Sequence, residues 1–225
     1  MAQFRIGDIA LRVPNHALTA KLREALNSGR YEINESRAIR RHVQAGDRVL
    51  DIGAGAGFVS INAGQLAGAD NVISVEANPA MIEALRENLD RNGMGATELL
   101  HAAVVADSYA GGTVRFEQKQ AFWASGLATD ATPAHKVVEV PALKLSELLE
   151  EYQPTVVSMD VEGAERELCQ QPWPPCVRML VMEIHTRQYP ASDVKAIFDG
   201  MSKNNMTYMP WGSTGEVIVL QRCEK

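Results

Sequence analysis

The chain has 225 residues, a net charge of −6, and 46% hydrophobic residues. This length suits one α/β core, so we expect a single domain over residues 1–225. The negative charge and the lack of a Lys/Arg cluster predict that nucleic acid is not a substrate. No secretion-signal pattern opens the chain, and no apolar run approaches the ~20 residues that span a bilayer. These features predict a cytoplasmic protein without a membrane partner.

In chain order, residues 1–45 have a mostly helical pattern and are expected to form a cap on the core of residues 46–225. Short apolar runs then alternate with helical patterns, which is typical of a parallel sheet covered by helices. The predicted strands are residues 49–52, 71–76, 99–105, 155–161 and 177–184. The predicted helices are residues 79–92, 146–152 and 192–203, with Ser192 as a possible cap of the last one.

The end of the chain predicts an antiparallel hairpin, with a turn at residues 212–215 between two β-prone runs. The fold class is therefore α/β, a Rossmann-like class I methyltransferase fold with a mostly parallel seven-stranded sheet. Residues 107–136 fit this sheet poorly and contain the aromatic pair Phe122–Trp123. We expect them to form an insertion that walls a substrate.

The strongest local signal is a glycine turn that directly follows the first predicted strand. Gly53, Gly55 and Gly57 alternate after Asp51, so the backbone can turn sharply and approach a ligand where a Cβ atom would clash. Glu76 ends the next strand, where a carboxylate can accept hydrogen bonds from both ribose hydroxyls of an adenosine. NAD-binding proteins share these features, so they indicate adenosine without choosing the cofactor.

Asp51 favours one cofactor over the other because of its charge. Two residues before the first glycine, a carboxylate is unfavourable beside a pyrophosphate but favourable beside the ammonium and sulfonium of S-adenosylmethionine. The turn thus predicts a S-adenosylmethionine-dependent methyltransferase. The alternative is a purely structural role, in which Asp51 only caps the turn and Glu76 is a solvated strand end.

Several segments resemble the FkbM family of methyltransferases, whose members include O-methyltransferases of natural products and glycans. The resemblance covers about residues 30–190, and its most specific piece is the DVEGAE run from Asp160 to Glu165. Ala77 departs from the family pattern, which has Pro there. The other similar segments are Tyr31-Glu32, Ala45-Gly46-Asp47, Asp51 to Gly57, Val75 to Pro79, Ala102-Ala103-Val104 and Glu183-Ile184-His185.

The resemblance implies O-methylation of a small-molecule hydroxyl, with N-methylation as the alternative. It also implies further cofactor-binding residues beside Asp51, the three glycines and Glu76. These are Tyr31, Glu32, Ala77, Ala103, Val104 and Asp160.

Asp160 and His185 are expected at the carboxyl ends of neighbouring strands, where open α/β sheets bind ligands. We predict that they are catalytic, with His185 taking a proton from the acceptor and Asp160 orienting it. A hydrogen-bonded strand-end histidine is an equal alternative. A metal held by Asp160, Glu183 and His185 is chemically possible, but strand alternation turns Glu183 and Ile184 to opposite faces. We therefore predict no metal.

Three other functional classes stay open at this point. An NAD-dependent oxidoreductase shares the glycine turn, but Asp51 and the terminal hairpin argue against it. A base-modifying nucleic-acid methyltransferase would carry an Asn/Asp-Pro-Pro-aromatic motif where this chain reads Asp160-Val161-Glu162-Gly163. A binding protein without turnover would keep the same cofactor residues. Cys169, Cys176 and Cys223 lack metal-type spacing and suggest reduced thiols.

Overall fold

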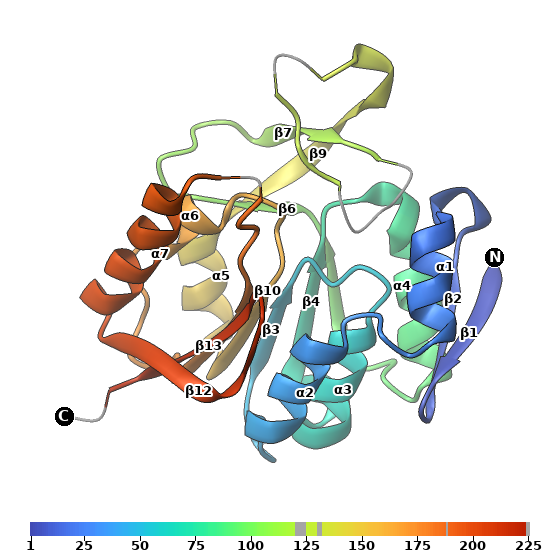
Figure 1. Ribbon diagram of the computed structural model, residues 1–225, viewed down its shortest axis with the longest axis horizontal. Helices are drawn as coiled ribbons and strands as arrows, with labels where there is room; N and C mark the ends of the chain where they lie inside the picture. Colours follow the sequence, from blue (N-terminus) through green and yellow to red (C-terminus); the bar gives the residue numbers. More distant parts are fainter. Residues whose placement is uncertain (120–124, 130–131, 188, 224–225) are drawn as a thin grey trace.

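The computed structural model describes residues 1–119, 125–129, 132–187 and 189–223. Its centre is a seven-stranded sheet in the order β12-β13-β11-β10-β3-β4-β5 (Figure 1). The five strands from β11 to β5 are parallel, and β12 and β13 are antiparallel. This confirms the predicted Rossmann-like fold. The strands are β3 (Val49–Ile52), β4 (Val72–Glu76), β5 (Glu98–His101), β10 (Val156–Met159), β11 (Met179–Glu183), β12 (Met206–Thr214) and β13 (Val217–Arg222).

Helices cover both faces of this sheet. Buried side chains of α2 and α3 pack on one face, and those of α5, α6 and α7 pack on the other. The fully buried strands β3 and β4 form because apolar residues follow one another without alternation, as a sheet covered on both faces requires. The helices are α1 (Ala20–Asn27), α2 (Ile33–His42), α3 (Phe58–Ala67), α4 (Pro79–Arg91), α5 (Leu145–Tyr152), α6 (Glu165–Cys169) and α7 (Ala191–Lys203).

The start of the chain differs from the expected helical cap. Residues 2–13 form a hairpin of β1 (Ala2–Ile6) and β2 (Ile9–Val13), which lies at the right of Figure 1. Its apolar side chains pack against α1 and α4. Buried apolar residues alternate at Phe4 and Ile6 in β1 and at Ile9, Leu11 and Val13 in β2. This is the two-residue period of a strand, so the helical prediction for this segment is wrong.

A second correction concerns residues 99–105, predicted as one strand. The backbone leaves the central sheet after His101, and β6 (Ala103–Val105) joins a second sheet in the order β6-β9-β7-β8. This sheet contains the predicted insertion and stands above the central sheet in Figure 1. Its other strands are β7 (Thr113–Glu117), β8 (Gly126–Leu127) and β9 (Val137–Lys144). Phe122 and Trp123 lie outside the described residues.

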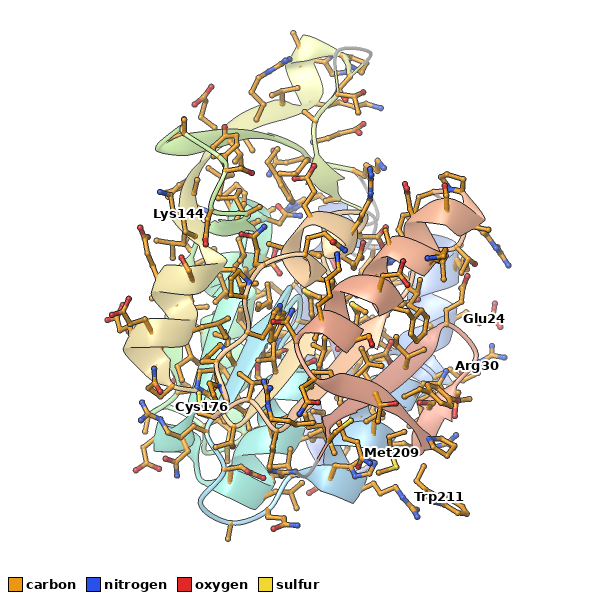
Figure 2. The ribbon with its side chains drawn as sticks, turned by 90° about the vertical axis from the view of Figure 1, so that its left-hand side faces the viewer. Glu24, Arg30, Lys144, Cys176, Met209 and Trp211 are labelled. Atoms are coloured by element: carbon orange, nitrogen blue, oxygen red, sulfur yellow. The ribbon has the colours of Figure 1, made fainter. Side chains whose placement is uncertain are left out.

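Two element boundaries also shift. Helix α7 begins at Ala191 with Pro190 at its N-cap, so Ser192 does not cap it. In the terminal hairpin, β12 continues to Thr214 through an irregularity after Met209, which moves the turn to Gly215 and Glu216. Figure 2 shows the Trp211 side chain on the outside of this edge strand, where it is 65% exposed. Among the described residues, no helix is long and apolar enough to cross a membrane.

Candidate active site

A cleft opens at the carboxyl ends of β3, β4 and β10, and we call it the glycine-turn cleft. It contains about 660 Å³ of empty space, within the ~300–1,000 Å³ of ordinary ligand pockets. Strand ends form its floor, and Phe116 and Leu127 of the second sheet form part of its wall. The sequence did not single out these two residues. Eight predicted cofactor residues line the cleft: Glu32, Gly53, Gly55, Glu76, Ala77, Ala103, Val104 and Asp160.

The glycine turn packs closely against neighbouring segments of the chain. Gly53 has φ +87°, and a Cβ atom there would lie 1.8 Å from the Asp160 carbonyl oxygen. Gly57 has φ +85°, and its Cβ atom would lie 2.6 Å from the Leu85 side chain. Glycine is therefore required at both positions before any ligand is considered. The turn brings the end of β3 directly against the end of β10.

Glu76, the last residue of β4, lines the glycine-turn cleft, and its contact with a ribose remains a prediction. Its Oε2 accepts a hydrogen bond from the Gly55 backbone N–H (2.7 Å), and its Oε1 accepts one from the Asn78 N–H (2.6 Å). Burial raises the pKa of this carboxyl, although both hydrogen bonds oppose the shift. The carboxylate is thus fixed on the cleft floor, with lone pairs left for hydroxyl donors.

Asp51, Tyr31 and Gly57 are not among the residues that line the glycine-turn cleft. Asp51 is buried and accepts a hydrogen bond from the Ser60 hydroxyl. Burial raises its pKa to about 6, against the hydrogen bonds from Ser60 and Ser158. Tyr31 is buried beside Phe58, with 6.2 Å between the ring centroids. Their roles toward a cofactor remain predictions.

A second, larger cleft of about 1,200 Å³ meets the first, and we call it the acidic cleft. Glu32, Asp160 and Glu162 line both clefts, so these residues mark where the two meet. Its carboxylates are Glu32, Glu35, Asp160, Glu162, Glu183 and Glu216. Its basic groups are Lys21, Arg30, His185 and Arg187. The sequence analysis did not assign Glu35 to a site, because α2 brings it to the strand ends only in three dimensions.

His185 lies among the carboxylates, beside Asp160 as predicted. Its Nδ1 is 2.7 Å from Glu165 Oε1, and its Nε2 is 3.4 Å from both Asp160 Oδ1 and Glu162 Oε1. Burial lowers the pKa of the ring, but the hydrogen bonds with Glu162 and Glu165 outweigh it and raise the pKa to about 11. In this arrangement His185 is protonated at neutral pH. It is then suited to hold the carboxylates in place, and poorly suited to take a proton.

For Asp160, the surroundings disfavour the charged form of the side chain. Burial and the charge of Glu183 raise its pKa well above the ordinary value, although His185 opposes the shift. Its Oδ1 is buried and has no hydrogen-bond partner among the described residues. An oxygen in this state is a strong acceptor for any cationic or N–H group that enters either cleft.

Parts of the chain are similar to known methyltransferases. The family model for the TRM5/TYW2 methyltransferase domain matches residues 23–108. The ribosomal protein L11 methyltransferase of Dechloromonas aromatica is 39% identical over 71 residues, which cover 32% of this chain and 24% of that protein. The same enzyme of an Exiguobacterium species is 38% identical over 58 residues, which cover 26% and 18%. The chain thus matches only about a quarter or less of these relatives.

Among solved structures, Trm5b from Pyrococcus abyssi has a TM-score of 0.50 at 13% identity, and the match covers 96% of this chain and 52% of that one. The matching family model and the relatives are methyltransferases, in line with the predicted enzyme class and its cofactor, S-adenosylmethionine. These matches are not to the FkbM family, so that resemblance stays a prediction.

The predicted partners are corrected. We expected a small-molecule acceptor and no nucleic acid. The curated relatives are instead named for a macromolecular substrate, a ribosomal protein, which overturns the small-molecule prediction. The small-molecule prediction came from the family resemblance alone. The exclusion of nucleic acid came from the net charge, which hides an uneven distribution. Residues 1–48 contain nine Arg or Lys residues and five Asp or Glu residues, although the whole chain is negative.

Proposed function

We propose that this protein methylates an amino group of a protein, with S-adenosylmethionine in the glycine-turn cleft and the amine in the acidic cleft. The observation that carries the proposal is the meeting of the two clefts at Glu32, Asp160 and Glu162. A methyl donor and its acceptor must lie in line and within contact distance, which adjoining clefts allow. The printed name of the L11 methyltransferases, whose acceptor is a protein, supports the acceptor class.

The fit of the cofactor rests on the residues of the glycine-turn cleft. Glu76 is fixed in position for the ribose hydroxyls, and the apolar residues Ala103, Val104 and Phe116 are suited to cover the adenine. S-adenosylmethionine, when bound, supplies a methyl group on a positively charged sulfur. The carboxylates of Asp160 and Glu162 lie where they stabilise the positive charges of both reactants.

The charge of the acidic cleft favours an amine over a phosphate-flanked group. Six acidic side chains on its wall outnumber the four basic ones, and this excess favours an ammonium ion over an RNA phosphate. The amine must lose a proton before its nitrogen lone pair can attack the methyl carbon. Asp160 Oδ1, buried and without a hydrogen-bond partner, is placed to orient the amine through an N–H donor. His185, protonated, keeps this carboxylate in position.

The test is a transfer assay with radiolabelled S-adenosylmethionine and two acceptor pools, RNA-free ribosomal proteins and total tRNA. We expect label in the protein pool, stable to base and recovered as a methylated amine after acid hydrolysis. Base-labile label would indicate a methyl ester. Label only in RNA, or only as a methyl ester, would contradict the proposal.

A further inference from the structure

Three possible metal ligands meet on the wall of the acidic cleft. One ligand atom each from Asp160, Glu183 and His185 lies within 4.8 Å of the other two. Asp160 follows β10, and Glu183 and His185 lie at the end of β11, its parallel neighbour. The strand alternation that separates Glu183 from Ile184 places Glu183 and His185, two residues apart, on the same side. Strand alternation therefore does not keep Glu183 and His185 from binding the same ion.

The imidazole of His185 is held as in a metal site. Its Nδ1 is bonded to Glu165, which is fully buried, so its Nε2 faces the other carboxylates. Ligating histidines regularly use their second nitrogen in this way. The 3.4 Å between Nε2 and Asp160 Oδ1 exceeds the ordinary hydrogen-bond length. It matches the roughly 3.0–3.4 Å that separates two ligands, each about 2.1 Å from one ion, at octahedral to tetrahedral angles.

A separate observation favours a cation at this position. Asp160 Oδ1 is a buried carboxylate oxygen that no donor among the described residues satisfies. The His185 side chain is only 10% exposed, so water has little access to Nε2. Buried carboxylate oxygens are normally hydrogen-bonded or bound to a metal. A divalent ion between these atoms would displace the proton from His185 Nε2 to solvent, and it would satisfy Asp160 and neutralise the surrounding acids.

We propose that Asp160, Glu183 and His185 bind a divalent transition-metal ion, with Zn²⁺ and Mn²⁺ as the candidates. Two carboxylates and one imidazole suit these ions better than Mg²⁺, which prefers oxygen ligands alone. Three protein ligands leave further coordination positions open to water. Because the ion and an ammonium group need the same carboxylates, the ion would compete with the acceptor. This competition rests on the proposed function, whereas metal binding does not.

The test is calorimetric titration of metal-free protein with Zn²⁺ and with Mn²⁺. We expect one site in the natural protein and at least a tenfold weaker affinity in His185→Gln and in Asp160→Asn. His16→Gln is the matched control, because His16 is exposed in the N-terminal region and does not line the acidic cleft. Unchanged binding in His185→Gln, or no binding to the folded natural protein, would overturn the proposal.

X-ray absorption of the Zn²⁺-loaded natural protein provides a second readout that does not depend on a variant folding. The expected first shell contains one imidazole nitrogen and oxygen atoms. Sulfur ligands would instead assign the ion to the cysteines and overturn the site. In transfer assays, added Zn²⁺ should raise the apparent KM for the amine acceptor. Metal binding in a protein that methylates no amine would leave this site standing and refute the proposed function.

Discussion

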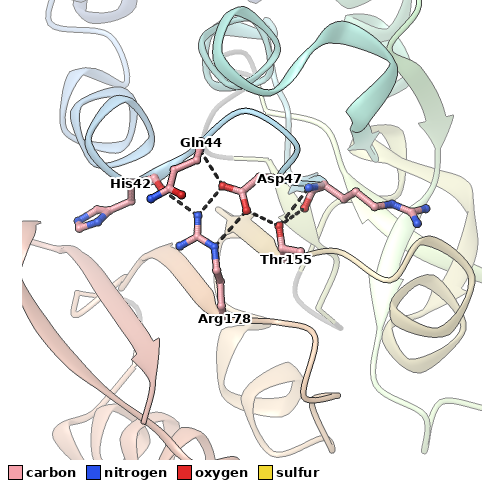
Figure 3. A network of polar contacts seen from close by, with 6 residues as sticks. His42, Gln44, Asp47, Thr155 and Arg178 are labelled. Atoms are coloured by element: carbon pink, nitrogen blue, oxygen red, sulfur yellow. Dashed lines mark hydrogen bonds and ion pairs between the residues drawn. The ribbon is translucent and has the colours of Figure 1, made fainter. Parts of the chain in front are cut away.

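The two ends of the same three strands, β3, β10 and β11, carry polar groups in opposite states. At the amino ends, Asp47 accepts hydrogen bonds from Thr155 Oγ1 (2.7 Å) and the Gln44 N–H (2.7 Å), and it is paired with Arg178 (Figure 3). Arg178 also donates to the His42 carbonyl oxygen. At this end Asp47 and Arg178 neutralise each other.

At the carboxyl ends, acids outnumber the bases around them. Six carboxylates line the acidic cleft, and Asp160 keeps a buried oxygen without a hydrogen bond. An unsatisfied cluster costs folding free energy, and it is useful only if a cationic ligand completes it. We propose that the amino ends stabilise the sheet and that the carboxyl ends bind reactants. Exchanging one residue at a time tests this division.

The largest effect is expected from Asp160→Asn, which keeps the size of the side chain and removes its charge. We expect transfer to the protein acceptor to fall by roughly 100-fold or more, because an orienting carboxylate is lost at the meeting point of the clefts. The unfolding free energy should stay within about 1 kcal/mol or rise, since a crowded charge is removed. A discontinuous assay measures the rate of methyl transfer, and urea unfolding measures the unfolding free energy. Near-normal turnover would remove Asp160 from the active site.

Glu165→Ala should lower the unfolding free energy by about 3 kcal/mol, because it leaves a buried imidazolium without its closest partner. This residue belongs to the carboxyl ends yet acts as a structural support. Glu167→Ala, on the exposed side of the same helix, is the control and should cost less than about 0.5 kcal/mol. Equal losses in the two variants would show that Glu165 does not hold His185.

Asp47→Asn should cost about 1–2 kcal/mol of stability and leave methyl transfer unchanged, since the network in Figure 3 lies at the far end of the strands. Asp70→Asn, at an exposed acid, is the control for loss of a negative charge. Chemical unfolding and the transfer assay are measured on the same preparations. A marked loss of methyl transfer in Asp47→Asn, with an unfolding free energy equal to that of the natural protein, would contradict a purely structural role for the amino ends.

The smallest expected effect is the pH dependence of the stability that Asp47→Asn loses. Burial opposes the shift, but hydrogen bonds from Arg178 and Thr155 lower the pKa of Asp47 below its ordinary 3.8. A depressed carboxyl pKa stabilises the fold above the unfolded value, and this stability is lost as the pH falls through the folded value. The difference between natural protein and Asp47→Asn should therefore shrink below about pH 4. If the difference in unfolding free energy between the two proteins grew at low pH, the pKa of Asp47 would be raised in the fold and not lowered.

Local sequence signals predicted the parts of the fold that local geometry determines. The run from Val49 to Gly57 reveals a strand and a glycine turn, and Pro79 and Asn92 bracket α4. The terminal hairpin was likewise visible. The second sheet was not, because β6 pairs with β9 across a long segment that carries no signal for its partner.

The site shows the same limit. Glycine turn and strand-end residues were predicted because an open sheet always binds ligands at its carboxyl edge. Glu32, at the N-cap of α2, was predicted from the family resemblance. Glu35 joins that edge from α2 itself, and no spacing in the sequence reveals this. The pairing of His185 with Glu165 was also missed. It required the position of α6 relative to β11.

The most direct test of the central claim is the affinity for S-adenosylhomocysteine, measured by calorimetry on the natural protein and on Glu76→Gln. The account predicts one site in the natural protein and binding at least tenfold weaker in the variant, because a fixed carboxylate acceptor for the ribose hydroxyls is lost. Absence of binding to folded natural protein, or equal affinity in the two proteins, would contradict the placement of the donor in the glycine-turn cleft.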